Sequence, residues 1–454
     1  MIPYYQEPNI TIYHGDCLEI MPSLAPDSID AIVTDPPYGL EFMGKDWDKG
    51  VPGIRFWTEA LRVAKPGCHL LAFGGTRTFH RLVCAIEDAG WEIRDTIGWI
   101  YGSGFPKSLN IGKAIDKMQG NEREIVGGYM HGGTRQSGIK GKDLGQVWHE
   151  NSKGSTQWEG WGTALKPAWE PIIVARKPLI GTVAENVLKF GTGGINIDGC
   201  RIETDGRPLR EVYPLREDVN YNPSSLQGRI DGSLQSSKAI GITTQGRFPA
   251  NLIHDGSDEV MAGFPNTKSG KDINPTTKGA KSAFFGHGNE YYNQETNYGD
   301  SGSAARFFYC AKASKSERDE GLEGIEKEIG HNRFDKCSKC GGYILQNPDR
   351  PSACKCENPT REHNRIKGNF HPTVKPLALM RYLCRLVTPP NGLILDPFMG
   401  SGSTGKAARQ EGFRFIGIDT EADYCEIAKR RMIKIQEVLP FNNNILQSAK
   451  KCEQ

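Results

Sequence analysis

The 454-residue chain carries 56 basic and 54 acidic side chains, so its overall charge does not indicate nucleic-acid binding, and any DNA-binding surface has to be a local patch. Its length allows two or three domains, or one domain with large insertions. A hydrophobic content of 37% with 54 glycines predicts that part of the chain is rich in loops.

The sequence contains no pattern typical of a membrane or secreted protein. It has no run of 18 apolar residues, and residues 1–16 lack the basic start and apolar stretch of a secretory signal. The 12 cysteines mostly stand singly among apolar residues, which favours a reducing compartment with buried thiols. We therefore expect a cytoplasmic protein without membrane spans.

Residues 1–115 alternate between strand and helix patterns. The strand patterns lie at 10–16, 28–35, 69–75 and 93–102, and the helical patterns at 56–67 and 78–91. Strands separated by helices imply a parallel sheet with right-handed crossovers. We therefore predict that this segment is one half of an α/β domain.

The middle of the chain is poor in periodic patterns. Residues 116–160 are rich in Gly, Lys, Ser and Gln and are predicted to be a flexible insert, after which 161–180 supplies another apolar strand. Residues 181–370 are again rich in small polar residues, with as many acidic as basic side chains, so they are not a simple basic arm. Residues 371–435 return to helix and strand patterns, and 436–454 are predicted to be a polar tail.

The stretch A-I-V-T-D-P-P-Y-G-L, residues 31–40, ends a predicted strand on a carboxylate, two prolines and an aromatic ring. Alone it also fits a plain turn, because Asp and Pro are common turn formers. As a binding site, Asp35 and the carbonyl of Pro36 are two hydrogen-bond acceptors, held rigid by Pro36 and Pro37, and Tyr38 presents its ring. Such a group suits a planar ligand that carries an NH2 group.

A second motif, L-I-L-D-P-F-M-G-S-G-S-T-G-K-A-A at 393–408, has a strand, a Gly-rich turn and the start of a helix. Gly400, Gly402 and Gly405 satisfy G-x-G-x-x-G, and Asp419 ends the next predicted strand. Glycines let a ligand approach the backbone, and an acid after the second strand binds ribose hydroxyls. The motif therefore predicts a cofactor that contains adenosine.

Three cofactor classes fit this motif, and a Gly-rich turn without a ligand is the alternative to all of them. The first is NAD or FAD. The second is ATP, because 400–406 also reads G-x-x-x-x-G-K, but Ala407 offers no hydroxyl for Mg²⁺. The third is S-adenosylmethionine, whose sulfonium and amino group favour a carboxylate such as Asp396 at the loop entrance.

Together, T-D-P-P-Y-G at 34–39 and L-D-P-F-M-G-S-G-S-T-G at 395–405 closely resemble the DNA amino-methyltransferases, which methylate exocyclic amines of adenine or cytosine. The catalytic motif precedes the cofactor motif, which resembles the permuted β-type subgroup. H-P-T-V-K-P at 371–376 also resembles a segment of that family, and 246–260 and 303–322 resemble stretches in phage-borne members.

This resemblance implies a Rossmann-like α/β fold with a mixed, mostly parallel sheet. Residues 1–115 would form the catalytic half, 161–180 its returning strand, and 371–435 the cofactor-binding half, with 181–370 as an inserted target-recognition region. Basic residues that would read or hold DNA in this insert include Arg201, Arg207, Arg229 and Arg247.

The same resemblance implies roles for individual residues. Asp35 and the Pro36 carbonyl would accept from the base amine, and Tyr38 would stack on the ring. Asp419 would hold the cofactor ribose and Asp16 would meet its adenine. The methionine end would be lined by Asp396, Gly400 and Gly402, and the loop residues Pro397, Phe398 and Ser401 would also bind the cofactor. Thr373 and Lys375 would lie near the cofactor carboxylate, with a solvated Lys375 as the alternative.

The expected substrate is duplex DNA with the target base flipped out. In the resembled family Asp at the first motif position is usual for adenine and Ser is commoner for cytosine, so we expect N6 of adenine, with N4 of cytosine as the alternative. RNA, a protein amide or an inactive DNA-binding relative are further alternatives. A homodimer or a cognate restriction system, in a bacterial or phage-infected host cell, would fit the family.

Four cysteines in the insert predict a structural zinc site. Cys337 and Cys340 form a C-x-x-C pair that resembles a zinc-ribbon knuckle, and Cys354 and Cys356 form a second, C-x-C pair within 337–356. The second spacing departs from the usual pattern, so His331 or His363 could replace a thiolate. Free or disulfide-linked thiols are the alternative. A bound zinc ion would stabilise a Gly-rich segment with little core of its own.

Overall fold

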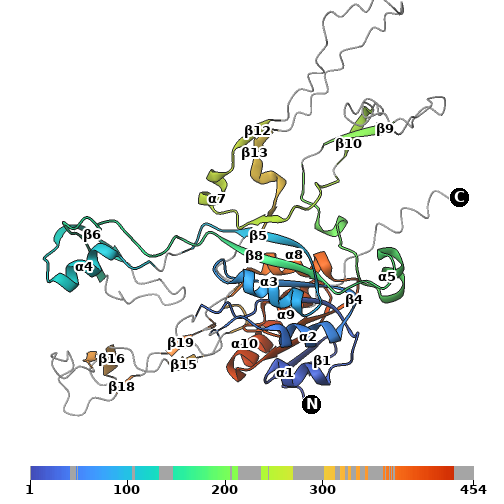
Figure 1. Ribbon diagram of the computed structural model, residues 1–454, viewed down its shortest axis with the longest axis horizontal. Coiled ribbons are helices and arrows are strands. Elements are labelled where there is room, and N and C mark those ends of the chain that lie inside the picture. The colour runs from blue at the N-terminus through green and yellow to red at the C-terminus, as the bar shows by residue number, and fades with distance from the viewer. Residues whose placement is uncertain are drawn as a thin grey trace, which may run out of the picture. The chain divides into compact units, whose positions relative to one another are not determined.

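The structure is a computed structural model with two compact units, Tyr101–Ala168 and the remainder, Met1–Ile100 with Trp169–Gln454 (Figure 1). The structure describes residues 2–40, 48, 50–104, 108–131, 147–204, 207–212, 237–243, 245–268, 301–311, 317, 319–322, 326–328, 334–337, 343–345, 361–362, 365–367, 369, 371 and 374–433.

One large sheet organises the first unit, Met1–Ile100 with Trp169–Gln454, and Tyr101–Ala168 is the second unit. Over the described residues its strands lie in the order β1-β2-β21-β20-β3-β4-β8-β5-β11-β14. Their bounds are β1 Tyr5–Glu7, β2 Ile10–His14, β3 Ile29–Thr34, β4 Ala64–Phe73, β5 Glu92–Ile100, β8 Trp169–Arg176, β11 Leu252–His254, β14 Tyr309–Cys310, β20 Leu393–Asp396 and β21 Arg414–Asp419.

Most neighbouring strands in this sheet are parallel. The exceptions among the described pairs are β1 against β2, and β8, which runs antiparallel between β4 and β5. The parallel pairs include β20 with β21 and β20 with β3. The prediction of a mixed, mostly parallel α/β sheet is therefore confirmed.

Helices cover both faces of the sheet. α1 to α3 pack against one another and against β4 and β5, whereas α8 to α10 form a second group against β2, β3, β20 and β21. The helix bounds are α1 Cys17–Ile20, α2 Ile54–Val63, α3 Phe79–Asp88, α4 Ile111–Gln119, α5 Val183–Phe190, α7 Asp258–Gly263, α8 Leu377–Val387, α9 Ser403–Gln410 and α10 Ala422–Ile433, with short 3-10 turns at Met21–Ser23, Asp198–Cys200 and Ala304–Phe307.

One helix ends earlier than its pattern predicted. The spacing within 56–67 predicted a helix that stops at Pro66-Gly67, whereas α2 ends at Val63, and the sequence A-K-P-G already belongs to β4. Pro66 explains this end, because the residue before a proline is pushed out of the helical region.

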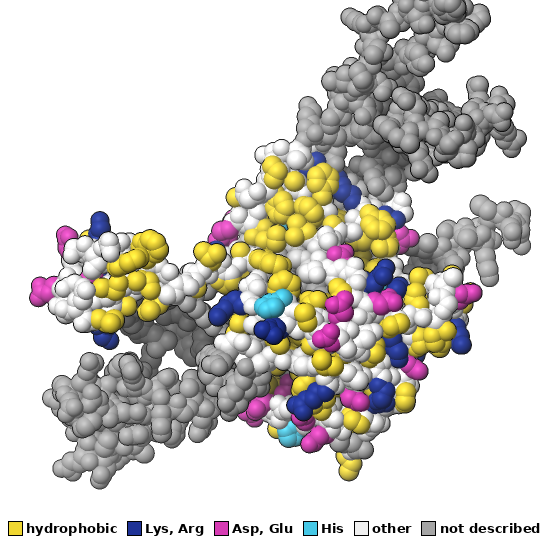
Figure 2. All heavy atoms as spheres, in the orientation of Figure 1, with side chains coloured by type: hydrophobic (Ala, Val, Ile, Leu, Met, Phe, Trp, Pro, Cys, Tyr) yellow, Lys and Arg dark blue, Asp and Glu magenta, His cyan; other side chains and the backbone are white. Residues whose placement is uncertain are grey.

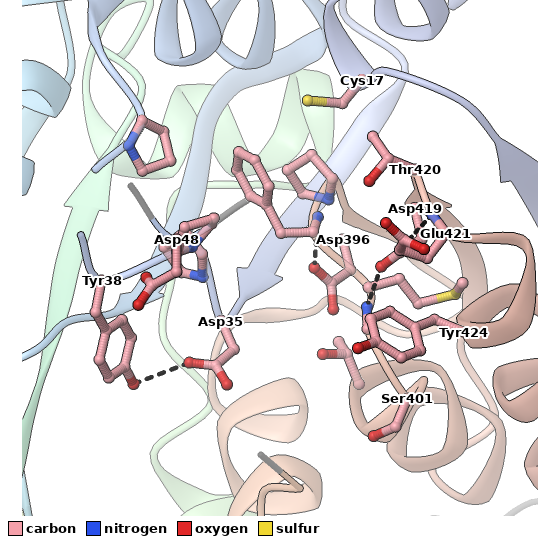
Figure 3. Close-up of a pocket in the computed structure, with 18 of the residues that line it drawn as sticks. Cys17, Asp35, Tyr38, Asp48, Asp396, Ser401, Asp419, Thr420, Glu421 and Tyr424 are labelled. Carbon is pink, nitrogen blue, oxygen red and sulfur yellow. Dashed lines mark hydrogen bonds between the residues drawn. The ribbon is translucent and has the colours of Figure 1, made fainter. Parts of the chain in front are cut away.

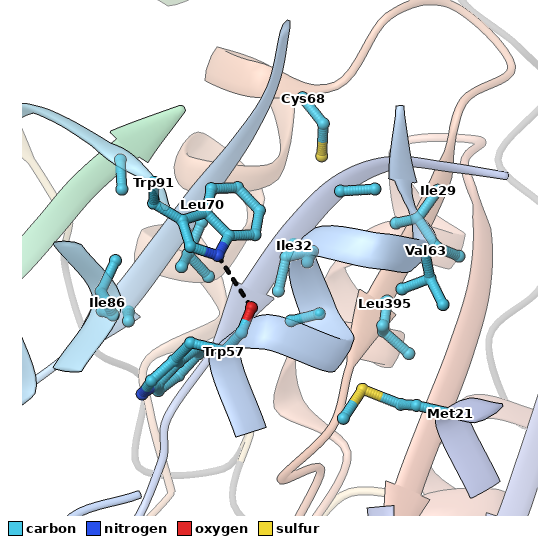
Figure 4. Close-up of a cluster of buried hydrophobic side chains, with 14 of the residues drawn as sticks. Met21, Ile29, Ile32, Trp57, Val63, Cys68, Leu70, Ile86, Trp91 and Leu395 are labelled. Atoms are coloured by element: carbon cyan, nitrogen blue, oxygen red, sulfur yellow. Dashed lines mark hydrogen bonds between the residues drawn. The ribbon is translucent and has the colours of Figure 1, made fainter. Parts of the chain in front are cut away.

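The core lies between the first helix group and the sheet. β3 is buried at every position, as expected for a central strand covered on both faces. Figure 4 shows Trp57 and Trp91 packed beside Ile32, with the Trp91 ring nitrogen donating to the Trp57 carbonyl at 3.0 Å. Burying each such side chain contributes roughly 1.5–3 kcal/mol. This packing fixes β3, and with it the start of the Asp35 turn.

The segments predicted as inserts contain regular elements. Within 116–160 the second unit has part of α4 and an antiparallel pair, β6 Glu124–His131 with β7 Val147–Lys153. Within 181–370, β11 and β14 extend the large sheet. The same range holds the small pairs β9 Arg207–Val212 with β10 Ser237–Thr243, β12 Asn266–Lys268 with β13 Ser301–Ser303, β15 Glu326–Glu328 with β19 Arg365–Lys367, and β16 Phe334–Cys337 with β17 Tyr343–Leu345 and β18 Arg361–Glu362.

Several predicted features fall outside the described residues. Cys340, Cys354 and Cys356 are among them, and of Cys337 only the backbone in β16 is described. The described residues contain no cluster of three or more His, Cys, Asp or Glu side chains arranged to hold a metal ion. In the same part of the chain, no helix is long and apolar enough to span a membrane. Zinc binding therefore stays a prediction.

Candidate active site

Pairing between β3 and β20 brings the two sequence motifs together. Ala31 lies opposite Ile394 and Ile32 opposite Leu395 in parallel register, although more than 360 residues separate them in the chain. From β20 the sheet continues to β21 on one side, and from β3 to β4 on the other. In open α/β sheets ligands bind beyond the carboxyl ends of strands at such a switch point. Asp35 and Asp396 both stand at this edge.

The turn after β3 holds Asp35 and Tyr38 in a network of hydrogen bonds. The Tyr38 hydroxyl lies 2.9 Å from Asp35 Oδ1 and 3.1 Å from Glu170 Oε2, and Figure 3 shows the first of these contacts. The Lys375 ammonium lies 3.0 Å from Asp35 Oδ2, from Glu170 Oε2 and from the Tyr38 hydroxyl. Thr78 Oγ1 donates to the Tyr38 carbonyl at 2.6 Å, which fixes the turn backbone.

The carboxylates of Asp35 and Glu170 shift the pKa values of Lys375 and Tyr38. Burial opposes the charged form of Lys375, but the carboxylates of Asp35 and Glu170 outweigh it and raise the lysine pKa well above its ordinary value. Burial and the same two carboxylates raise the pKa of Tyr38 well above 10. At neutral pH Lys375 is therefore an ammonium ion and Tyr38 keeps its hydroxyl proton.

The loop after β20 is held by Asp396 and Asp419. Asp396 Oδ1 accepts from Thr34 Oγ1 at 2.6 Å and from the Phe398 amide at 3.2 Å. Asp419 Oδ2 accepts from the Gly400 amide at 2.7 Å, as Figure 3 shows. Burial raises the pKa of Asp396 to about 7 and that of Asp419 to about 6. Both carboxylates favour a cationic or hydroxyl-bearing partner, because such a partner stabilises the ionised form.

Two loop glycines are required by the backbone and by close neighbours. Gly400 has φ +53°, and a Cβ there would lie 2.7 Å from His371 Nε2. Gly402 has φ +73°, and a Cβ there would lie 2.7 Å from the Ala428 Cβ on α10. Any larger residue would clash as well as strain the backbone. The glycine pattern read from the sequence therefore has a steric cause in the fold.

A single cavity of about 360 Å³ joins the two motifs. Its lining includes the predicted residues Asp16, Asp35, Pro36, Pro37, Tyr38, Lys375, Asp396, Pro397, Phe398, Gly400, Ser401 and Asp419. Gly15, Phe56, Thr420, Glu421 and Tyr424 also line it. The volume lies within the range of about 300–1,000 Å³ that is typical of small-ligand sites.

Several predicted residues lie in positions that the sequence did not specify. Asp16 lines the cavity, but it also caps α1 by accepting from the Leu18 amide at 2.9 Å. Gly402 packs closely against Ala428 on α10, as described above. Lys375 lies on the Asp35 side of the cavity, and Thr373 lies outside the described residues. Contact of these two residues with the cofactor carboxylate stays a prediction.

The structure adds two residues that pattern reading missed. Glu170 begins a buried strand and contacts Lys375 and Tyr38. Arg431, 2% exposed on α10, donates to the Ser401 carbonyl at 2.6 Å, to the Ser401 hydroxyl at 3.0 Å and to the Ser403 hydroxyl at 3.2 Å. An acid in a largely apolar strand was the available signal for Glu170, whereas Arg431 lies in a helix rich in charged residues and gave no such signal.

The cavity fits S-adenosylmethionine, the cofactor that the sequence resemblance implies. Asp396 is a buried carboxylate, and such a group is stabilised by a cation. Asp419 lies at the end of the second strand, where a ribose-binding acid is expected. The two glycines keep Cβ atoms away from the loop backbone. These residues would hold the cofactor between Asp16 and the Asp35 turn.

Replacing Arg431 with alanine is expected to weaken S-adenosylmethionine binding about tenfold or more. The guanidinium orders the Gly-rich loop, and hydrogen bonds to charged groups contribute roughly 1.5–3 kcal/mol each. Arg430→Ala is the matched control, because Arg430 pairs with Glu426 on the exposed side of the same helix. Calorimetry would measure both affinities. Equal affinities in the two variants would contradict a role for Arg431 in the loop.

The basic residues proposed for DNA contacts are partly described. Arg201 lies 2.7 Å from Asp198 and donates to the Gly246 carbonyl, and Arg247 lies over the Phe307 ring. The Arg207 side chain and the whole of Arg229 lie outside the described residues. On the face in Figure 2, basic and acidic side chains are interspersed over the described residues. DNA contact by these arginines stays a prediction.

Comparison with known proteins gives a family match over most of the chain. The family model described as DNA methylase (N6_N4_Mtase) matches residues 29–430. The chain is 48% identical over 64 residues to the type II methyltransferase M2.LlaDCHI of Lactococcus lactis subsp. cremoris, covering 14% of this chain and 24% of that protein. It is 42% identical over 76 residues to the putative methylase YubD of Escherichia coli K12, covering 16% and 34%. The chain thus spans about a quarter to a third of these curated relatives.

The solved structures that match the chain are distant in sequence and have low TM-scores. The M1.HpyAVI–SAM complex is 16% identical, with a TM-score of 0.35 over 93% of this chain and 99% of that chain. The PvuII DNA methyltransferase, named as cytosine-N4-specific, is 14% identical, with a TM-score of 0.40 over 96% and 91%. The family match rests on the sequence model, which spans the Asp35 turn, the Gly-rich loop and the segment between them. The chain therefore belongs to the N6/N4 family of DNA methylases, the DNA amino-methyltransferases whose two motifs it carries.

Proposed function

We propose that the protein transfers a methyl group from S-adenosylmethionine to the exocyclic N6 amine of an adenine flipped out of duplex DNA. The observation that carries this proposal is the single cavity in which the Asp35–Tyr38 turn and the Gly-rich loop lie side by side. A base-binding turn and a cofactor-binding loop are both needed for such a transfer. The family match is consistent with this activity.

Asp35 and the Pro36 carbonyl activate the base. An exocyclic amine is a weak nucleophile, because its lone pair is delocalised into the ring. Two acceptors out of the ring plane draw the nitrogen toward tetrahedral geometry and release that lone pair. When bound, S-adenosylmethionine supplies a methyl group already activated by its positive sulfur. The protein therefore contributes mainly orientation and placement of charge.

Tyr38 receives the flipped base. Its carbonyl is fixed by Thr78 and its hydroxyl by Asp35 and Glu170, so the ring is held at the cavity wall. Extruding a base from the duplex costs a few kcal/mol, and stacking on an aromatic ring offsets part of that cost. The rigid ring therefore favours an extrahelical base.

Adenine is proposed over cytosine because the motif begins with Asp35. The two bases present similar NH2 groups, so the acceptors alone do not discriminate between them. Nucleoside mass spectrometry of DNA from a host that expresses the chain tests the choice. N6-methyladenine is the expected product. N4-methylcytosine without N6-methyladenine would overturn the base assignment and leave the cofactor site unaffected.

Sequence choice is proposed to reside in residues 181–370, because the catalytic turn has no means of reading neighbouring bases. Exchanging this segment for that of a relative with a different recognition site is expected to move methylation to the relative's site. Sequencing that detects modified bases would locate the methylated positions. Methylation that stays at the original site would place specificity elsewhere in the chain.

The four cysteines between 337 and 356 are proposed to bind one structural zinc ion. Elemental analysis of protein purified without chelator is expected to find about one zinc per chain. Cys337→Ser with Cys340→Ser should remove it and lower the thermal stability. Cys84→Ser, at an exposed cysteine on α3, is the matched control. Protein that contains no zinc would refute the site.

A further inference from the structure

Glu170 joins the Asp35 turn through two side chains that line the cavity. Glu170 belongs to β8, which runs antiparallel to β4. The first residues of β8 therefore stand at the carboxyl end of β4 and of the strands parallel to β4. Its carboxylate contacts the Tyr38 hydroxyl at 3.1 Å and the Lys375 ammonium at 3.0 Å. The side chain is 19% exposed and lies beside Asp35, 21% exposed. Two carboxylates therefore share the same two donors.

The Tyr38 hydroxyl can donate to only one of the two carboxylates at a time. The Tyr38 hydroxyl has one proton but two acceptors within reach, Asp35 Oδ1 at 2.9 Å and Glu170 Oε2 at 3.1 Å. Rotation of the O–H bond moves this proton from one carboxylate to the other without displacing a heavy atom. When Glu170 accepts it, Asp35 Oδ1 becomes available for a new donor, such as an amine of a base.

The charges of Lys375, Asp35 and Glu170 also give Glu170 a role beside the target amine. Lys375 contributes one positive charge against the two negative charges of Asp35 and Glu170, so the trio carries a net charge of −1. Without Glu170, the lysine would neutralise Asp35 and weaken it as an acceptor. During transfer the amine nitrogen forms a bond to the methyl carbon, the sulfur keeps the electrons of the broken bond, and the nitrogen is positive until its proton passes to Asp35. A net negative charge beside that nitrogen stabilises this stage.

We propose that Glu170 is a positioning residue: it accepts the Tyr38 proton and balances Lys375, and it thereby keeps Asp35 free and negatively charged for the target amine. This inference rests on the proposed methyl transfer. It deepens that function by adding a residue that acts through Asp35 and Tyr38.

Steady-state kinetics of Glu170→Gln test the inference. Glu170→Gln is expected to lower kcat about 10- to 100-fold, because the negative charge that Glu170 maintains at Asp35 stabilises the amine most when the amine is positively charged. The KM for S-adenosylmethionine is expected to change less than threefold. Glu92→Gln is the matched control, because Glu92 pairs with Arg176 at the other end of β8. Thermal melting would verify that both variants fold.

Removing Lys375 as well provides the sharper test. The double variant Glu170→Gln with Lys375→Met restores the net charge of −1 at Asp35, and it is expected to recover at least several-fold of the lost kcat. A structural role for Glu170 would make the double variant no more active than Glu170→Gln. That outcome, or a Glu170→Gln kcat within twofold of the parent, would overturn the inference.

A binding measurement separates this inference from the catalytic rate. Once the parent's methylated site is known, duplexes can carry the target base with or without its exocyclic amine, and their affinities can be compared in the presence of S-adenosylhomocysteine. The parent is expected to prefer the amine-bearing base several-fold, and Glu170→Gln to lose that preference. An unchanged preference would refute the role of Glu170. A parent protein that methylates no DNA would instead refute the proposed function.

Discussion

Replacement of Asp35 by alanine is expected to abolish DNA methylation and to leave the affinity for S-adenosylmethionine within a few-fold of the parent. The Asp35 carboxylate contacts Tyr38 and Lys375 in the part of the cavity that is proposed to hold the base. Loss of one positioned electrostatic group in an active site costs about 10²–10³ in rate, and Asp35 supplies one of the two proposed acceptors. A radiolabelled methyl-transfer assay and calorimetry would measure the two quantities.

A matched substitution separates charge from hydrogen bonding at this position. Asp35→Asn keeps an oxygen acceptor but removes the charge, so we expect it to retain more activity than Asp35→Ala. Calorimetry that shows Asp35→Ala losing cofactor affinity, while its methylation rate stays near that of the parent, would reverse the assigned role.

The second large effect is expected at Asp396, whose replacement by alanine should weaken S-adenosylmethionine binding by more than about 100-fold. The carboxylate orders the loop through Thr34 and the Phe398 amide, and it would face the cationic part of the cofactor. Removing one partner of a buried charged interaction costs about 3–5 kcal/mol. Titration calorimetry with S-adenosylmethionine would measure the affinity. Unchanged affinity in Asp396→Ala would refute the assignment of this loop.

The pH dependence of the same binding step follows from the raised pKa of Asp396. Burial places that pKa at about 7, so the carboxyl is mostly protonated at pH 6 and mostly ionised at pH 8. A cation binds the ionised form, so affinity is expected to rise between pH 6 and 8 and then level off. Asp419, with a pKa of about 6, adds a smaller rise at lower pH. Asp396→Asn should flatten the profile above pH 6.5, and an unchanged profile would contradict this role.

The sequence was sufficient to predict that Asp35 and Asp396 stand at the carboxyl ends of two buried strands. β3 ends directly before Asp35, and β20 ends at Asp396. Both strands are short apolar runs followed by turn residues, so the residues of each segment were enough to place its carboxylate. Parallel pairing then places the two carboxyl ends at one edge, as β3 and β20 show. The fold class followed from the same alternation of strands and helices.

Glu170 and Arg431 could not be predicted, because their roles depend on direction and depth. The pattern of β8 indicates a strand, but not that it runs antiparallel, and only that direction brings Glu170 to the Asp35 edge. Arg431 lies near the end of a helix rich in charged residues, where an exposed side chain is the usual expectation. The contacts of Lys375 with the carboxylates of Asp35 and Glu170 were also not indicated by the sequence, and its predicted contact with the cofactor stays a prediction.

The cavity is proposed to transfer methyl groups from S-adenosylmethionine to an amine of DNA. The most direct measurement incubates the purified chain with deuterated-methyl S-adenosylmethionine and, separately, duplex DNA, RNA or a protein mixture, followed by mass spectrometry of the nucleosides and amino acids. The account predicts labelled N6-methyladenine from DNA, and none when Asp35→Ala replaces the parent. Label that appears in RNA or protein but not in DNA, or label in DNA that persists in Asp35→Ala, would contradict it.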